Sequence, residues 1–445
     1  MIKIKTFKRG GIHPDDKKLT KEVPIEEFPI PDKVYIPLTQ NLGAPPEPIV
    51  KKGDFVKTGQ LIAEAKSFVS ANVHSSVTGI VEKIDEHIDV SGYRKLTIII
   101  NAEKTDNWVE DIDTSNNIVR EIKIKNKSEI INKIREKGIV GMGGATFPTH
   151  VKLSIPEGKK CDYLIINGVE CEPYLTSDHR LMLEKGEEIL IGAKILMLAL
   201  DVNTCYIGIE NNKPDAINHL LELSKNYEGI IIQPLKLKYP QGAEKQLIYA
   251  ITGREVPSGG LPIDVGCIVQ NVGTTYAVYE AVQKNKPLIY RIVTVSGEGF
   301  IGKNFLVRIG TPIKLLINSV IGDQNYNFTS IISGGPMMGK ALISTEVPVT
   351  KGTSGILLFK DYKEQKLYPC IKCAKCVMVC PMGLMPSLLE KLIANERIEE
   401  AHKNNVLDCI ECGCCEYTCP SFRPLLEYIR LGKNKVLQML KSKKN

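Results

Sequence analysis

The chain has 445 residues, of which 43% are hydrophobic and 24% are charged, and its formal net charge is +7. This composition is typical of soluble globular proteins and excludes a wholly disordered or fibrous chain. The length predicts three domains, or four small ones, at about 150 residues per domain.

Most of the excess charge lies in residues 420–445, which hold seven Lys or Arg and a single Glu. The rest of the chain is nearly neutral, whereas a nucleic-acid-binding protein spreads basic charge over one face of a recognisable module. We therefore expect no nucleic-acid partner. The basic tail favours an acidic protein partner or a lipid surface.

No apolar run approaches the roughly 20 residues that a membrane-spanning helix needs. The longest candidate, residues 189–200, is interrupted by Lys194 and predicts a buried helix. Residues 1–11 contain basic side chains but lack the apolar stretch of a secretory signal. We therefore expect the chain to remain in the cytosol.

Residues 1–115 have the pattern of an all-β module. Residues 50–62 and 73–84 alternate short apolar strands with glycine turns. The pattern resembles a lipoyl-like barrel-sandwich module, in which a functional lipoyl lysine sits at a hairpin tip. Lys66 is the nearest candidate but has no evident tip, so we interpret it as an ordinary surface lysine.

Residues 116–289 alternate helices and strands. Asn126 and Glu129 predict the start of a first helix, and Gly138 predicts its end. Strands are then expected at 162–167, 204–209 and 230–237, and helices at 184–200, 214–227 and 243–252. This alternation predicts a parallel sheet covered by helices. Ligands of such sheets collect at the loops beyond the strand C-termini.

Two further domains are expected towards the C-terminus. Residues 290–359 return to short strands with glycine turns and predict a small β-rich module. Residues 360–445 alternate cysteine motifs with helices, and the apolar residues of 386–404 have helical spacing. We therefore predict a multidomain α/β chain that ends in a helical ferredoxin domain.

Two cysteine motifs in this last domain each have the spacing Cys-x2-Cys-x2-Cys-x3-Cys-Pro. This is the bacterial ferredoxin spacing, in which the fourth cysteine of each motif ligates the other cluster. One [4Fe–4S] cluster is therefore expected on Cys370, Cys373, Cys376 and Cys419, and the other on Cys409, Cys412, Cys415 and Cys380.

Zinc is the alternative metal, but zinc sites use two cysteine pairs separated by a spacer and not tandem quartets. Cys414, an extra cysteine within the second motif, is interpreted as a space-filling residue that binds no iron. Four more cysteines share no motif and are expected to be small buried residues, namely Cys161, Cys171, Cys205 and Cys267.

Residues 138–149 form a glycine-rich loop that contains Gly141, Gly143 and Gly144. The loop is not a dinucleotide-binding fingerprint, because Thr146 occupies the third glycine position and a predicted helix precedes it where a strand is required. Bare backbone near a helix start can approach a phosphate or a flat ring closely. The loop therefore either holds a ligand or makes a plain tight turn.

Polar residues follow the first and third expected strands, at the edge of the sheet where ligands are expected, and a further group lies at 270–274. Asn167, Glu170 and Glu172 follow the first strand, although these side chains alone also fit a solvated loop. The other residues of this kind are Tyr239, Gly242, Glu244, Asn271 and Thr274.

These loops appear in the same order in the FMN- and NADH-binding subunit of respiratory complex I, which residues 116–289 resemble. With the opening segment Phe7–Pro14, the barrel-sandwich module and the double ferredoxin, nearly the whole chain resembles the C subunits of Rnf ion-translocating electron-transport complexes. The resemblance implies a complex I flavin-subunit-like fold for residues 116–289 and a β-grasp fold for residues 290–359.

The resemblance also implies roles for the loop residues. Gly141, Gly143 and Gly144 line the flavin and nucleotide, and Lys152 approaches the flavin or its phosphate. Asn167 and Glu170 hydrogen-bond the flavin, and Asn271 and Thr274 bind the FMN phosphate. Glu172, Tyr239 and Glu244 contact NADH, Phe147 stacks on its adenine, and Gly242 belongs to the same cofactor-binding set.

Five positions depart from the complex I pattern. Val140 and Met142 replace two loop arginines, and Val169 and Ala243 replace acidic residues. Ile155 replaces a second adenine-stacking aromatic residue. These differences remove polar contacts, so looser NADH binding or a changed pose is expected.

The resemblance implies a peripheral electron-input subunit of an ion-translocating NAD:ferredoxin oxidoreductase, on the cytoplasmic face of the membrane. Its cofactors are NADH, FMN and two [4Fe–4S] clusters, because flavin joins the two-electron chemistry of NADH to one-electron carriers. No catalytic residue is expected beyond those that position cofactors. The implied partners are the membrane and peripheral Rnf subunits and, indirectly, a ferredoxin-type carrier.

Two other functions fit parts of the sequence. A soluble flavin and iron–sulfur reductase such as a cobalamin reductase has the same build, but the segment Gly10–Pro14 favours Rnf. Eight intact cysteine ligands argue against a non-enzymatic scaffold. The basic helix expected at 424–440 is either a docking element for membrane partners or a merely solvated helix.

Overall fold

A four-stranded parallel sheet lies at the centre of the α/β domain in the computed structural model, which describes residues 3–322, 328–360 and 365–443. The strands, in spatial order, are β11 (Ile230–Leu235), β10 (Cys205–Glu210), β9 (Tyr163–Asn167) and β12 (Cys267–Asn271). Every pairing between neighbours is parallel, as the sequence pattern predicts. The C-terminal ends of the strands therefore lie at one edge.

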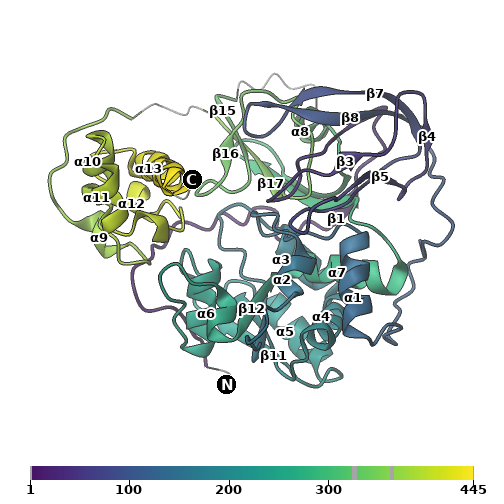
Figure 1. Cartoon of the computed structure of the whole chain (residues 1–445), viewed down its shortest axis with the longest axis horizontal. Coiled ribbons are helices and arrows are strands. Elements are labelled where there is room, and N and C mark those ends of the chain that lie inside the picture. Colours follow the sequence, from purple (N-terminus) through teal and green to yellow (C-terminus); the bar gives the residue numbers. More distant parts are fainter. Residues whose placement is uncertain (1–2, 323–327, 361–364, 444–445) are drawn as a thin grey trace.

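Helices cover both faces of this sheet (Figure 1). They are α1 (Lys127–Glu136), α2 (Thr149–Leu153), α3 (Ser177–Glu184), α4 (Gly186–Leu200), α5 (Pro214–Ser224), α6 (Glu244–Thr252), α7 (Val272–Lys284) and the 3-10 helix η1 (Pro262–Val265). Leu164 and Ile166 of β9 belong to one apolar core, whereas Ile165 between them belongs to another. The sheet is thus buried on both sides, as parallel sheets usually are.

Two local expectations in this domain can be compared with the structure. The side chain of Asn126 accepts hydrogen bonds from the backbone N–H groups of Ser128 and Glu129, which confirms the predicted helix start. The helix expected over residues 184–200 is confirmed as α4, which begins at Gly186, whereas the preceding helix α3 was not predicted; Lys185, at φ −132°, separates the two.

The barrel-sandwich module consists of two small sheets around one apolar core. One sheet contains β2 (Lys33–Pro37), β8 (Arg94–Ala102), β7 (Gly79–Ile88) and β4 (Phe55–Val56), and the other contains β3 (Glu47–Pro48), β5 (Leu61–Glu64) and β6 (Val73–His74). Lys66 is exposed and pairs with Glu64, as an ordinary surface lysine does.

A six-stranded mixed sheet with α8 (Ile313–Ile321) packed on it forms the small β-rich domain. Its strands, in spatial order, are β1 (Ile25–Glu27), β14 (Lys303–Arg308), β13 (Tyr290–Gly297), β17 (Gly355–Phe359), β15 (Ser330–Ser333) and β16 (Lys340–Ala341). Strand β1 comes from the beginning of the chain and pairs in parallel with β14.

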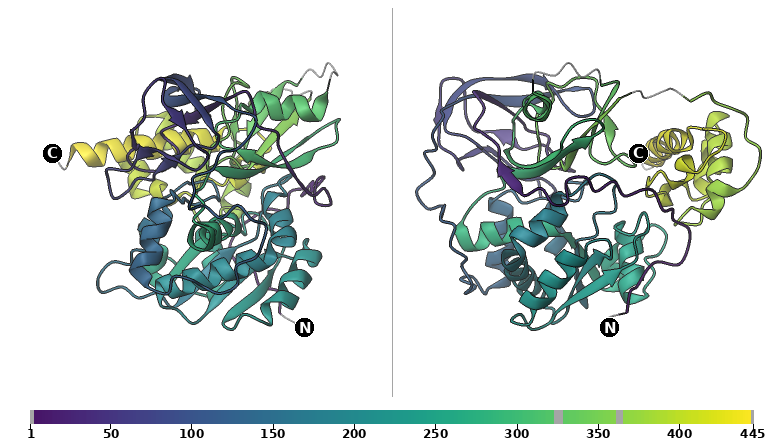
Figure 2. Two further views of the ribbon diagram at one scale, coloured as in Figure 1. Left: turned by 90° about the vertical axis from the view of Figure 1, so that its right-hand side faces the viewer. Right: turned by 180° about the vertical axis from the view of Figure 1, so that it is seen from behind.

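We call residues 3–28 the strap, because they run between the domains and lie outside the barrel-sandwich strands (Figure 2). Lys5 and Ile12 form β-bridges to Leu235 and Tyr239 of the α/β domain. The backbone N–H of Gly11 donates to the carbonyl of Val379 in the ferredoxin domain at 2.8 Å. With β1 in the small sheet, the strap contacts three domains.

The C-terminal domain is helical and stands at one end of the molecule (Figure 1). Its elements are α9 (Lys375–Met378), α10 (Pro386–Ala394), α11 (Ile398–Lys403), η2 (Val406–Asp408), α12 (Cys414–Tyr417) and α13 (Leu425–Ser442). Because α10 and α11 lie between the two cysteine motifs, the predicted helical ferredoxin is confirmed. Among the described residues, no helix has both the length and the apolar character needed to cross a bilayer.

Most basic side chains of α13 form ion pairs within their own domain. The pairs, with N–O distances between 2.5 and 3.1 Å, are Arg430–Glu411, Lys433–Glu411, Lys435–Glu396 and Lys443–Glu399. Lys444 lies outside the described residues. Much of the positive charge of this tail is therefore balanced by neighbouring glutamates.

Candidate cofactor site

The glycine-rich loop lies between α1 and α2, and the backbone of two of its glycines is exposed to solvent. Gly143 and Gly144 are exposed, and Gly144 has φ +115° with no atom within 4 Å of an added Cβ. The loop closes on itself, since Gly141 N donates to Phe147 O at 2.8 Å. Phe147 is half-buried beside this closure. An accessible and anchored backbone of this kind favours a ligand-holding loop.

Residues from two other domains hold the loop from outside. The buried Lys351, which precedes β17, donates from Nζ to Gly138 O at 2.8 Å and to Asn72 O of the barrel-sandwich module at 2.7 Å. Burial lowers the pKa of this ammonium to about 7. Leu42 N of the same module donates to Thr146 O at 3.1 Å. The barrel-sandwich module is thus a direct support of the loop.

Asn271 and Thr274 lie at the start of α7, beneath the glycine-rich loop. Asn271 Oδ1 caps the helix by accepting from Gly273 N at 2.8 Å, and Thr274 Oγ1 accepts from Met142 N at 2.8 Å. A Cβ added to Gly143 would lie 3.5 Å from Asn271 Cβ. Helix starts present unpaired N–H groups and favour anions, so this corner fits the phosphate expected there.

The loop after β9 joins the loop after β11 through Asn167. Its Nδ2 donates to Gly242 O at 2.8 Å, and its Oδ1 accepts from Val169 N at 3.1 Å. Two of the residue groups predicted from sequence are therefore in direct contact. Both the nitrogen and the oxygen of the Asn167 side-chain amide are thus hydrogen-bonded within the protein.

Glu170 adopts a left-handed backbone conformation with φ +48° and uses its carboxylate to cap a helix. Oε1 accepts from Asp178 N at 2.7 Å, and Oε2 accepts from His179 N at 3.2 Å, both at the start of α3. Burial, and then the charge of Glu170, raise the pKa of Asp178 to about 6. The carboxylate that the resemblance assigns to the flavin thus has a local structural partner as well.

Lys152 and Glu244 form an ion pair between α2 and α6. Lys152 Nζ lies 2.5 Å from Glu244 Oε1, and both side chains are partly exposed. The resemblance assigns one residue to the flavin and the other to NADH, so their contact places the two predicted cofactor regions next to each other.

Tyr239 connects the nucleotide loops to the second cysteine motif. Its side chain is buried, and its hydroxyl donates to Cys412 O at 2.9 Å and lies 3.4 Å from Glu172 Oε1. The other carboxylate oxygen of Glu172 accepts from Met337 N at 3.0 Å. Burial raises the pKa of Glu172 to about 7. Two residues predicted to contact NADH therefore lie at the boundary with the ferredoxin domain.

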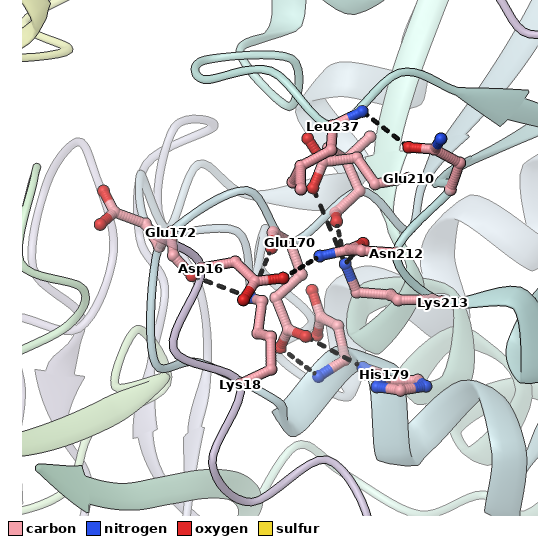
Figure 3. A network of polar contacts seen from close by, with 12 residues as sticks. Asp16, Lys18, Glu170, Glu172, His179, Glu210, Asn212, Lys213 and Leu237 are labelled. Atoms are coloured by element: carbon pink, nitrogen blue, oxygen red, sulfur yellow. Dashed lines mark hydrogen bonds and ion pairs between the residues drawn. The ribbon is translucent and has the colours of Figure 1, made fainter. Parts of the chain in front are cut away.

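Lys18 of the strap supports the same loop, and sequence reasoning did not find it (Figure 3). Its ammonium donates to the carbonyls of Glu170, Glu172 and Leu175 at 2.8, 2.9 and 2.6 Å. The loop also contains Tyr174 at φ +67°, and such conformations persist only where the surroundings fix them. The sequence carries no local signal for Lys18, because its partners are more than 150 positions away.

A second buried lysine completes this support. Lys213 Nζ donates to Val169 O at 2.7 Å and lies 3.8 Å from Glu210 Oε2, with both side chains almost wholly buried (Figure 3). Asn212 donates to Asp16 of the strap at 2.9 Å. The charged network therefore ties the strap to the sheet edge on the side of the loop after β9.

The four cysteines assigned to the second-motif cluster lie close together. Burial is the main cause that raises the pKa of Cys409 to about 11, and the thiols of Cys412 and Cys380 act in the same direction. Burial, and then the charges of Cys409, Cys412 and Cys380, raise the pKa of the Cys415 thiol. Cys380, which belongs to the first motif in sequence, is thus grouped with the second motif in space, as the exchanged-ligand assignment requires.

The first-motif cysteines have a more open environment. Cys376 and Cys419 belong to one apolar cluster with Leu425 and with Cys415 of the second motif, whereas Cys370 and Cys373 are exposed. Among the described residues, no group of three or more potential ligands converges on the position of a single metal ion. The preference for cubane clusters over zinc therefore rests on the spacing of the two motifs.

Cys414 is fully buried at the boundary between the two redox domains. Its Sγ points to Tyr239 O at 3.9 Å, a placement that agrees with a space-filling residue. Cys161, Cys205 and Cys267 are also buried, and Cys171 is partly buried.

Three family models match successive parts of the chain. They are described as "RnfC Barrel sandwich hybrid domain" for residues 5–105, "Nuo51 FMN-binding domain" for residues 134–280 and "4Fe-4S dicluster domain" for residues 369–422. Their order is the order of domains in the structure.

Relatives that match over nearly their whole length decide the family. The chain is 50% identical to the C subunit of the "Proton-translocating ferredoxin:NAD(+) oxidoreductase complex" of Clostridium ljungdahlii, over 97% of this chain and 94% of that protein. It is 43% identical to the C subunit of the "Na(+)-translocating ferredoxin:NAD(+) oxidoreductase complex" of Acetobacterium woodii, over 98% of both chains. The chain belongs to the family of Rnf C subunits.

A third relative, the C subunit of the "Ion-translocating oxidoreductase complex" of Rhodobacter capsulatus, is 41% identical over 96% of this chain and 83% of that protein. Membership of this family confirms the predicted barrel-sandwich, flavin-subunit-like and double [4Fe–4S] domains. It favours Rnf over the soluble reductase. The individual FMN, NADH and cluster ligands stay predictions.

Replacing Lys18 is expected to weaken FMN binding. Lys18→Met leaves three buried carbonyls without their donor, an effect of about 1–3 kcal/mol, and frees the loop that carries Glu170. We expect the Kd for FMN, measured by fluorescence titration of flavin-depleted protein, to rise at least about fivefold. Lys17→Met, which alters the exposed neighbouring lysine, is the control. Unchanged FMN affinity of Lys18→Met would contradict this role.

Glu172 is expected to make stability depend on pH. Its pKa is raised from 4.5 to about 7 in the folded chain, so the folded state holds a proton that the unfolded state releases. Stability should therefore fall as pH rises between about 5 and 8, by on the order of 2 kcal/mol. Melting temperatures of wild type and Glu172→Gln should agree near pH 5, and the variant should melt higher at pH 8. Parallel curves would rule out this titration.

Cysteine variants test the exchange of ligands between the motifs. Cys380→Ser and Cys409→Ser should lose the same electron paramagnetic resonance signal, and the double variant should lose nothing more, because both residues serve one cluster. Cys370→Ser should lose the other signal. Cys414→Ser, the matched control, should keep both. Loss of the Cys370 signal in Cys380→Ser would exclude the exchanged assignment.

Proposed function

We propose that this chain is the electron-input subunit of an Rnf-type ion-translocating ferredoxin:NAD+ oxidoreductase. It passes electrons between NADH, FMN and two [4Fe–4S] clusters, on the cytoplasmic face of the membrane. The names of its relatives and the matched FMN-binding and dicluster domains support this function. The other Rnf subunits are its partners, and a ferredoxin-type carrier is reached through them.

The observation that carries the proposal is the contact between Tyr239 and Cys412. The Tyr239 hydroxyl donates to the backbone of a predicted cluster ligand at 2.9 Å, and the same side chain borders Glu172 of the predicted NADH site. A nucleotide site and an iron–sulfur motif that share one buried side chain fit direct electron exchange. A scaffold has no need of this contact.

The corner between the glycine-rich loop and α7 fits the FMN phosphate. Asn271 and Thr274 fix the helix start, and the missing side chain of Gly143 leaves room beside it. When bound there, FMN accepts an electron pair from NADH and releases single electrons to the clusters. The protein positions the two ring systems, which is the main requirement of hydride transfer.

The nucleotide side of the site is built from fewer polar groups than in complex I. Val140 and Met142 are buried, and Arg291 donates from Nη2 to Met142 O at 2.7 Å. A buried arginine thus orders the loop from beneath, but its own charge is not presented to a ligand. Lys152 and Glu244 supply an exposed charge pair next to the loop.

The two clusters follow in a fixed spatial order. Cys409, Cys412, Cys415 and Cys380 would hold the cluster beside Tyr239, and this cluster would supply the first one-electron acceptor when NADH is the donor. The cluster on Cys370, Cys373, Cys376 and Cys419 has two exposed ligands and is the exit. The order reverses when the electrons come from reduced ferredoxin.

Anaerobically purified protein tests the proposal. We expect one FMN and eight irons per chain, four for each of two clusters, and partial bleaching of the visible spectrum on addition of NADH. The chain should also reduce ferricyanide with NADH. Protein that contains both cofactors but shows neither response would contradict the proposed function. Cys409→Ser and Cys380→Ser should reduce ferricyanide with NADH as wild type does, because this reaction takes place at the flavin.

A further inference from the structure

Five large apolar or aromatic side chains are exposed beside the ligands of the exit cluster. They are Leu367, Tyr368, Ile371, Tyr417 and Phe422, which are between 45% and 67% exposed. We call them the outer face. Single exposed apolar residues are common on protein surfaces, whereas a group of them marks an interaction site.

The two chain segments that carry the outer face are hydrogen-bonded to each other. Tyr368 N donates to Ser421 O at 3.1 Å, and Ser421 Oγ donates to Pro369 O at 3.0 Å. In Figure 1 the segment before α9 forms the outermost edge of the ferredoxin domain, on the side away from the α/β domain. The two segments that carry the outer face therefore lie side by side, and the first of them runs along the outer edge of the domain.

Exposed lysines flank the first segment of the outer face. Residues 365–380 contain Lys366, Lys372 and Lys375 and no acidic residue, and all three lysines are exposed. Within the described part of the chain, no carboxylate pairs with Lys372 or Lys375, whereas Arg430, Lys433 and Lys435 of α13 have glutamate partners. The lysines beside the exit cluster are therefore free to attract a partner, whereas much of the charge of the basic tail is balanced within its own domain.

We propose that the outer face docks the next electron carrier, a redox protein that presents an apolar surface ringed by Asp and Glu. The proposal rests on the proposed function, which supplies the electrons that leave through this cluster. Because Cys370 and Cys373 are exposed, a partner docked on the outer face would lie close to the cluster that these cysteines hold. Five side chains cover an area typical of weak electron-transfer contacts, below about 1,200 Å², and the flanking lysines provide the complementary charge that steers such encounters.

The test uses membrane vesicles from cells that lack this chain but contain the other subunits of the complex. Purified wild type, Leu367→Glu and Lys372→Glu are added back, and binding is measured by co-sedimentation at low salt. Leu367 lies outside the ligand loop. Iron content is measured for each variant, so that a lost cluster is not mistaken for a lost contact. Ile301→Glu, at a position that is 82% exposed between β13 and β14, is the matched control.

We expect both outer-face variants to bind the vesicles about tenfold more weakly, equivalent to about 1.4 kcal/mol. NAD+ reduction by reduced ferredoxin should fall in parallel, while NADH:ferricyanide activity stays within about twofold of wild type. Salt should weaken wild-type binding more than that of Lys372→Glu, because added ions screen the flanking lysines. Ile301→Glu should behave as wild type throughout.

Three results would overturn the docking surface. The first is wild-type binding and coupled activity in both variants. The second is equal binding of wild type to protein-free vesicles of anionic lipid, which would assign the face to lipid. The third is loss of binding in Ile301→Glu as well. Failure of the proposed function is distinguishable, because it would remove the NADH:ferricyanide activity of wild type and leave the binding measurement intact.

Discussion

The position of Tyr239 constrains the rest of the redox architecture. This side chain belongs to a loop of the parallel sheet, yet its hydroxyl is bonded to the backbone of the second cysteine motif. It is buried, so the bond is shielded from water and geometrically fixed. Any movement of the ferredoxin domain relative to the nucleotide loops must first break it. The packing of Tyr239 thereby fixes the second cysteine motif against the nucleotide loops.

A second constraint comes from the lysines that hold loops by their carbonyls. Lys18, Lys213 and Lys351 each place an ammonium on backbone oxygens of loops that the cofactors are expected to contact. Each comes from a different part of the chain. Removal of charged groups from water is unfavourable unless they are well bonded, so the contacts of Lys18 and Lys351 favour one arrangement of the segments that they join.

Sequence reasoning identified the features whose chemistry is local. The cysteine spacing, the strand and helix alternation and the glycine-rich loop all depend on neighbours within a few residues, and the structure contains each of them. Lys18 and Lys351 escaped notice because their partners lie far away in sequence and no spacing rule marks them. Glu170 shows that a family resemblance also misses local roles. The resemblance assigned this residue to the flavin but did not reveal that its carboxylate caps α3.

The strap also has a consequence for how the chain is made. Gly11 is hydrogen-bonded to Val379, and an added Cβ on Gly10 would lie 2.6 Å from the backbone of Cys380. The strap therefore needs partners that are synthesised much later than the strap itself. Such long-range closure is slow, and it can follow only after the ferredoxin domain has been synthesised. The strap thus reaches its final position late in folding, when it joins the ferredoxin domain to the other domains.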